Sequence, residues 1–129
     1  MKMRSIVSPN FKKLLEKLPV DVQEEARANF LKWKDNPTNV GWKKLAGMKA
    51  NMFSVEIGRR YRAIAVVDKE HDAAIWMFVG SHETYNNWIN IHRQMTQENW
   101  TKGFKERLVN RQNAQTPLPS SGSKKMQPS

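Results

Sequence analysis

The sequence predicts an α+β fold in which an N-terminal helical hairpin packs on a small antiparallel β-sheet. Between residues 9 and 36, apolar side chains recur at the spacing of amphipathic helices, and Pro19 interrupts this pattern. We therefore expect two short helices joined by a tight turn. Between residues 52 and 79, apolar side chains alternate or form short blocks separated by turns, which is typical of an antiparallel meander.

The two helices have recognisable ends. The first is expected to begin at Ser8, because serine caps helix N-termini and Pro9 suits a first helical turn. Its apolar face consists of Phe11, Leu14, Leu15 and Leu18. The second begins near Asp21 and ends at Asn36, because Pro37 disfavours helical geometry in the residue before it. Its apolar face consists of Val22, Ala26, Phe30 and Trp33.

Four stretches have the character of strands. Residues 3–7 predict a short first strand, and residues 52–57 alternate between apolar and other side chains. In residues 61–67 the side chains beyond Arg62 are apolar on both faces, which indicates a central strand. Residues 74–79 form a further apolar run. Short turns between the last three favour antiparallel pairing, with the helices on one face of the sheet.

The C-terminal third adds helices to this unit. Residues 84–93 predict one helix, and residues 97–112 predict another that is amphipathic and basic. The composition after residue 114 is dominated by Pro, Ser, Gly, Gln and Lys, which is typical of a disordered tail. We therefore expect one domain over residues 1–95, an additional basic helix over 96–114 and a disordered tail over 115–129.

Charge and composition indicate which classes of binding partner and which cellular compartment to expect. The net charge of +10 arises from 22 basic and 12 acidic residues, which predicts attraction to polyanions or to an acidic protein. Residues 41–62 carry six basic residues and one acidic residue. The chain has no cysteine, which excludes disulfides and thiolate metal sites. It also has no signal-peptide pattern and no membrane-length apolar run, so we expect a cytoplasmic protein without membrane contact.

Two segments carry the side chains that are suited to binding and catalysis. Residues 58–64 place three arginines and a tyrosine beside a glycine turn, and residues 80–86 place a histidine and a tyrosine beyond the next apolar run. If the two runs pair as neighbouring strands, we expect four side chains to converge: Arg60, Arg62, His82 and Tyr85. Guanidinium, imidazole and phenol groups on one basic surface are suited to binding and cleaving a phosphodiester.

Three motifs in this order resemble the RelE/ParE superfamily of bacterial toxins. They are residues 41–47 (GWKKLAG), residues 61–64 (YRAI) preceded by Gly58, and residues 80–86 (GSHETYN). The resemblance covers roughly residues 9–92. Within the superfamily, the chain resembles more narrowly the RelE-like mRNA interferases of type II toxin–antitoxin systems.

The resemblance implies two helices on an antiparallel sheet and a cytosolic antitoxin that wraps the basic surface in a hetero-oligomer. In the RelE-like branch it implies metal-independent endonucleolytic cleavage of mRNA at the ribosome. The ParE-like branch shares the fold but inhibits DNA gyrase without catalysis, and a third alternative is an inactive RNA-binding domain of the same fold.

The resemblance also assigns roles to individual residues. Arg62 matches the strand arginine of the family and is expected to bind phosphate and stabilise the transition state. Arg60 is expected on the same strand face two residues earlier, in a supporting role. His82 is a candidate general base or acid, and Tyr85 is a candidate for base stacking or proton transfer. Glu83 is a further candidate base. Each also has a structural interpretation, namely a solvated charge, a helix-terminal residue or core packing.

Basic residues around the site are expected to contact the RNA backbone. They are Lys43, Lys44 and Lys49 before the sheet, together with Arg59 in the glycine turn. No metal or other cofactor is expected, because His71, His82 and His92 are scattered and no histidine pair or acidic triplet accompanies them.

Overall fold

The computed structural model describes residues 3–110, except for the side chains of residues 38 and 39. The elements in chain order are β1 (Arg4–Val7), α1 (Pro9–Glu16), α2 (Val20–Asp35), the 3₁₀ helix η1 (Pro37–Val40), β2 (Lys43–Lys44), β3 (Met52–Ile57), β4 (Tyr61–Asp68), β5 (Ala73–Ser81), α3 (His82–His92), α4 (Gln97–Thr101), the 3₁₀ helix η2 (Lys102–Phe104) and α5 (Lys105–Val109). The tail predicted over residues 115–129 lies outside the described residues.

The five strands form one mixed sheet in the order β1-β5-β4-β3-β2. The neighbouring pairs from β2 to β5 are antiparallel, as the sequence predicts for the meander. β1 differs, because it pairs in parallel with β5. A parallel pair needs a long connection, and the helices and strands between β1 and β5 provide one. β4 and β5 consequently occupy interior positions, which explains why their side chains are apolar on both faces.

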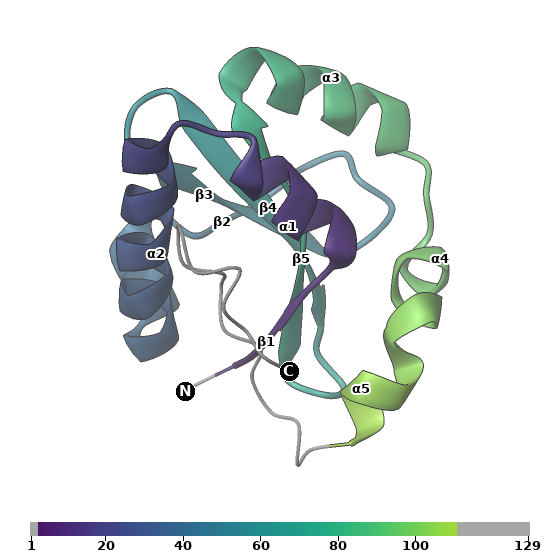
Figure 1. The fold of residues 1–129 in the computed structure, drawn as a ribbon. Helices are drawn as coiled ribbons and strands as arrows, with labels where there is room; N and C mark the ends of the chain where they lie inside the picture. The colour runs from purple at the N-terminus through teal and green to yellow at the C-terminus, as the bar shows by residue number, and fades with distance from the viewer. Residues whose placement is uncertain (1–2, 111–129) are drawn as a thin grey trace.

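The helical hairpin is confirmed and covers one face of the sheet. α1 begins where expected, with the Ser8 hydroxyl accepting a hydrogen bond from the backbone N–H of Phe11 at 3.1 Å. In Figure 1, α1 lies in front of the sheet and α2 stands at its left. The buried cluster between hairpin and sheet includes Phe11, Leu15, Ala26, Trp33, Val55, Ala63, Ala65 and Trp76.

A second helical layer covers the opposite face, which the sequence did not predict. α3 crosses the top of Figure 1, and α4 and α5 continue down the right-hand side. The second buried cluster includes Ile6, Met52, Ile64, Val66, Ile75, Phe78, Tyr85, Trp100 and Leu108. The guanidinium of Arg4 in β1 donates to the backbone carbonyls of Arg107 and Leu108, so the first strand is tied to the last helix.

The single helix predicted over residues 97–112 is divided into α4, η2 and α5. Gly103 lies in η2, and glycine is among the poorest residues for helix interiors. The bend allows both Trp100 and Leu108 to be buried, at 9 % and 2 % exposure.

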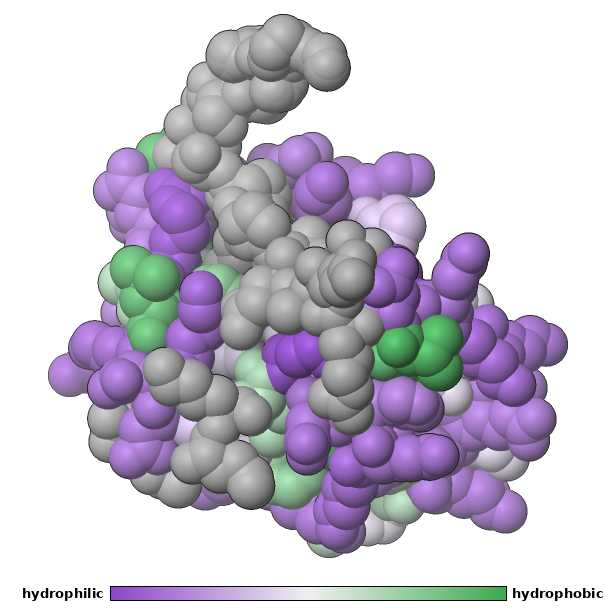
Figure 2. Space-filling model, turned by 90° about the horizontal axis from the view of Figure 1, so that it is seen from below, coloured by the Kyte–Doolittle hydropathy of each residue, from purple (hydrophilic) through white to green (hydrophobic). Residues whose placement is uncertain are grey.

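The surface is largely polar. The face shown in Figure 2 is mostly hydrophilic, with hydrophobic residues in separate spots. The large exposed apolar residues of the described part of the chain lie on three helices, namely Val20 and Leu31 on α2, Ile91 on α3 and Val109 on α5. Within residues 3–110, none of the helices has the length and apolar character needed to span a bilayer.

Candidate functional site

The two segments that carry the chemical groups meet at the junction of β4, β5 and α3. Arg62 is paired with Gly80, and Tyr61 with Ser81, across the antiparallel β4–β5 ladder. One step further, the backbone N–H of His82 donates to the carbonyl of Arg60 at 3.0 Å. The convergence expected if these strands are neighbours is therefore present.

Arg62 lies at the centre of the site and is held from two sides. One terminal nitrogen donates to the hydroxyl of Ser54 at 3.1 Å, and the other donates to the carboxylate of Glu56 at 3.0 Å. The guanidinium carbon lies 5.2 Å from the centre of the Tyr85 ring. The side chain is 15 % exposed, and its buried Nε has no hydrogen-bond partner among the described residues. The guanidinium is thus fixed in position, with its edges directed by β3 and its face covered by α3.

The first turn of α3 supplies the aromatic groups. Ser81 caps this helix, because its hydroxyl accepts from the backbone N–H of Thr84 at 3.3 Å. His82 and Tyr85 are three residues apart and therefore lie on the same side of the helix. Their ring centres are 6.2 Å apart at an interplanar angle of 69°. Tyr85 is buried, and His82 is partly exposed.

The backbone adds to the positive potential at this place. The positive end of the α3 dipole lies next to the permanent charge of Arg62, and helix N-termini favour anions. The turn between β3 and β4 adds the exposed Arg59 and Arg60. A phosphate that approaches this corner meets positive charge from β4, from the turn and from the helix end.

Arg60 does not lie on the strand face that the sequence predicts for it. β4 begins at Tyr61, so Arg60 belongs to the preceding turn and its side chain is exposed. The turn starts at Gly58, whose φ of +62° is readily adopted only by glycine. Arg60 contributes charge to the corner of the sheet, whereas Arg62 contributes a fixed hydrogen-bonding geometry.

The three lysines do not form one cluster. Lys43 is paired with Ser54, so it lies on the same face of the sheet as Arg62. Lys44 is paired with Phe53 and lies on the opposite face. Lys44 and Lys49 both line a surface hollow of about 490 Å³, whose other lining residues include Val67 and Asp68 from the far end of β4. Of the two lysines in β2, Lys43 is therefore the one that shares the face of the arginine.

Sequence reasoning missed Ser54 and Glu56 as members of this site. Glu56 is paired with Arg62 in the β3–β4 ladder, and Ser54 precedes it by two residues on the same face. The sequence did contain a signal for Glu56, because it is the single acidic residue in positions 41–62, which also contain six basic residues. A short turn at Gly58 would have set the register that brings Glu56 opposite Arg62.

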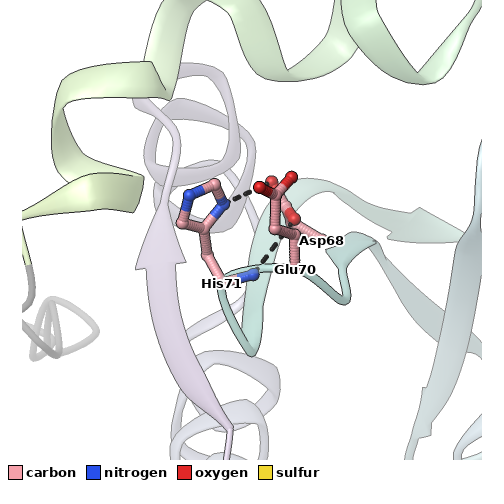
Figure 3. A group of neighbouring side chains, drawn as sticks. All are labelled: Asp68, Glu70 and His71. Carbon is pink, nitrogen blue, oxygen red and sulfur yellow. Dashed lines mark hydrogen bonds and ion pairs between the residues drawn. The ribbon is translucent and has the colours of Figure 1, made fainter.

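A separate group of titratable residues lies at the turn between β4 and β5 (Figure 3). Asp68, Glu70 and His71 bring one ligand atom each to within 4.8 Å of the others, although the sequence had suggested only scattered histidines. The Nδ1 atom of His71 is 3.2 Å from the carboxylate of Asp68, and its backbone N–H donates to the same side chain at 3.3 Å. These contacts stabilise the turn at the end of β4 opposite to Arg62.

Solved structures with the same fold belong to toxins of toxin–antitoxin pairs. The RelBE2 toxin–antitoxin complex from Mycobacterium tuberculosis matches at 23 % identity and a TM-score of 0.53, covering 64 % of this chain and 100 % of that one. A mutant of the Escherichia coli toxin RelE in the free state matches at 19 % identity and a TM-score of 0.57, covering 72 % and 95 %. The archaeal RelE–RelB complex from Pyrococcus horikoshii matches at 18 % identity and a TM-score of 0.52, covering 63 % and 96 %.

Sequence comparison gives the family. The family model described as the ParE-like toxin domain matches residues 20–87, just over half of the chain. The comparison with curated protein sequences finds no match. The chain therefore belongs to the ParE-like toxin domains of the RelE/ParE superfamily.

Proposed function

We propose that this protein is the toxin of a type II toxin–antitoxin system and acts as a metal-independent endoribonuclease on mRNA at the ribosome. The observation that carries the proposal is the fixed guanidinium of Arg62, placed beside Tyr85 and His82 where β4 meets α3. The net charge of +10 supports a polyanionic substrate.

The chemistry requires a cation, groups that transfer protons and a substrate held in line. Arg62 binds the scissile phosphate and stabilises the extra charge of the pentacoordinate transition state. Tyr85 packs against the guanidinium and holds it in place. His82 transfers a proton, since imidazole can do so near neutral pH.

The surrounding surface holds the RNA. Lys43 on the same face and Arg59 and Arg60 in the adjacent turn contact neighbouring phosphates. None of these groups orients the attacking 2′-hydroxyl by itself. The ribosome supplies that orientation by presenting one codon in a fixed geometry, which converts a loosely bound substrate into a reactive one.

The partner is a cognate antitoxin in the same cytoplasm. Two of the structures with this fold are toxin–antitoxin complexes, one with RelB by its description. An antitoxin for this chain would carry acidic side chains that match the basic corner at Arg62 and would form a hetero-oligomer with the toxin.

Induced expression followed by mapping of mRNA 5′ ends tests the proposed function. We expect growth arrest and new 5′ ends inside translated codons, and we expect Arg62→Ala and His82→Ala to abolish both. Lys32→Ala on α2 serves as the control, because its exposed side chain lies on the opposite helical layer.

Other outcomes identify the alternatives. Growth arrest with DNA double-strand breaks and intact mRNA would show a gyrase inhibitor. Normal growth with the soluble protein present would point to the third alternative, an inactive RNA-binding domain of the same fold. Fully toxic, folded Arg62→Ala and His82→Ala variants would refute the assignment of these two residues.

A further inference from the structure

We propose that the turn between β4 and β5 binds a divalent transition-metal ion, with Asp68, Glu70 and His71 as the protein ligands. The turn lies at the end of β4 opposite to Arg62, so this inference goes beyond the proposed ribonuclease function and does not depend on it. The role of the ion is structural, and the chemistry proposed at Arg62 stays independent of metal.

The three side chains come from one short turn and reach the same point in space. Asp68 is the last residue of β4, and Glu70 and His71 follow it before β5 begins at Ala73. Each of the three offers one ligand atom, and these atoms all lie within 4.8 Å of one another. Figure 3 shows the two carboxylates beside each other, on the side of the imidazole ring that faces Asp68. Two oxygen donors and one nitrogen donor therefore converge.

One pair of these atoms has the spacing of two ligands on a single ion. A Zn²⁺ ion lies about 2.1 Å from nitrogen and oxygen ligands, which places neighbouring ligand atoms about 3.0–3.4 Å apart in tetrahedral or octahedral geometry. The Nδ1 atom of His71 is 3.2 Å from the carboxylate of Asp68. A hydrogen bond can have the same length, so only a measurement of metal binding separates the two interpretations.

The turn holds two of the ligands in place and leaves the third adjustable. The side chains of Asp68 and His71 are 15 % and 22 % exposed. The other carboxylate oxygen of Asp68 accepts the backbone N–H of His71 at 3.3 Å, and such hydrogen bonds to ligating carboxylates orient them toward the ion. Glu70 is exposed, so its longer side chain can rotate to close the coordination.

A surface hollow gives an ion access to these ligands. It has a volume of about 570 Å³, and residues of α4 and α5 form the rest of its lining. These residues include the carboxylate of Glu98 and the ammonium of Lys105. Three carboxylates and one ammonium make the hollow acidic in a chain whose net charge is +10. The local charge therefore favours a cation, against the charge of the whole molecule.

The kinds of donor atom select the class of ion. Imidazole nitrogen suits Zn²⁺ and the other late first-row divalent ions, whereas Ca²⁺ and Mg²⁺ take oxygen ligands. Ca²⁺ also needs about 6–8 oxygen ligands, which is more than Asp68 and Glu70 supply. We therefore expect Zn²⁺ to bind in preference to Ca²⁺ and Mg²⁺, with water completing its coordination.

Titration of the full chain with zinc, in a form without a histidine tag, tests the site. After metal is removed with EDTA, ZnCl₂ binding is measured by calorimetry, and the ring nitrogens of the three histidines of the chain are followed by ¹⁵N NMR. We expect one equivalent of Zn²⁺ to bind, and the ring signals of His71 to be the ones that show coordination. CaCl₂ and MgCl₂ should give no comparable binding.

The variants Asp68→Asn, Glu70→Gln and His71→Ala should each weaken Zn²⁺ binding at least about tenfold. Asp68→Asn keeps an oxygen for the backbone N–H of His71, so the turn retains that hydrogen bond. The matched control is Glu83→Gln, which removes an exposed carboxylate at the opposite end of the β4–β5 ladder and should bind Zn²⁺ like wild type. Zn²⁺ should raise the Tm of the wild-type protein and leave that of His71→Ala unchanged, because the ion binds the folded turn.

Three results would overturn the inference. The first is a wild-type protein that binds no Zn²⁺, or binds it no better than the three ligand variants. The second is coordination by His82 or His92 in place of His71, and the third is binding of Ca²⁺ or Mg²⁺ without Zn²⁺. Should Asp68→Asn or His71→Ala be misfolded by circular dichroism, Glu70→Gln decides the question, because its side chain is exposed. The proposed cleavage of mRNA is tested separately, by mapping of 5′ ends.

Discussion

At the scale of single residues, the site depends on how Arg62 is held rather than on its charge alone. Its two terminal nitrogens bond to Ser54 and Glu56, and its face lies on Tyr85. Arg59 is a nearby arginine that differs from Arg62 in burial, because its side chain is exposed in the turn. The two arginines allow geometry and charge to be separated by experiment.

Arg62→Lys should lower RNA cleavage about 10²-fold although the net charge is unchanged, because an ammonium is a point charge without the planar fork of a guanidinium. Arg59→Lys should retain nearly full activity. The rates are compared on ribosome-bound mRNA at equal protein concentration. Equal activity of the two variants would show that only charge matters at position 62.

At the scale of elements, the N-terminus of α3 positions the aromatic half of the site. Its cap, Ser81, immediately precedes His82. α1 has an equivalent cap in Ser8, where the hydroxyl also accepts a backbone N–H three residues further on. α1 packs on the other face of the sheet, away from Arg62.

Replacing either cap by alanine should lower the free energy of unfolding by about 1 kcal/mol. Ser81→Ala should in addition reduce RNA cleavage, because fraying of the first turn of α3 moves His82 and Tyr85. Ser8→Ala should leave cleavage unchanged. Urea unfolding and the cleavage assay on the same preparations check this, and equal losses of activity in both variants would argue against a positioning role for the α3 cap.

At the scale of the whole molecule, the C-terminal segment forms part of the second helical layer. Leu108 is almost fully buried in the cluster that also contains Trp100, Ile64 and Met52. Its neighbour Val109 is 64 % exposed. This pair of adjacent residues tests whether α4, η2 and α5 belong to the stable folded unit.

Leu108→Ala should lower the free energy of unfolding by about 2–5 kcal/mol, because it leaves a cavity in a packed cluster. Val109→Ala should change it by less than about 0.5 kcal/mol. Urea denaturation of the full chain measures both. If the two variants are equally stable, the segment after α3 is not integral to the fold.

The sequence alone determined the hairpin, the meander and the components of the basic corner. The spacing of apolar residues in helices and strands is a local property, so the secondary structure of residues 9–36 and 52–79 can be predicted without tertiary information. Alternation along β3 also placed Ser54 and Glu56 on one face, although their significance was not recognised. The motifs at residues 41–47, 58–64 and 80–86, taken in this order, indicated the family.

The tertiary structure decided which of these residues act together. The parallel pairing of β1, the second helical layer and the separation of Lys43 from Lys49 all depend on contacts between distant parts of the chain. The partners of Arg62 depend on strand register, and a shift of one residue would have directed Glu56 to the opposite face. Local pattern therefore specifies which elements form, whereas nonlocal packing determines which side chains share a site.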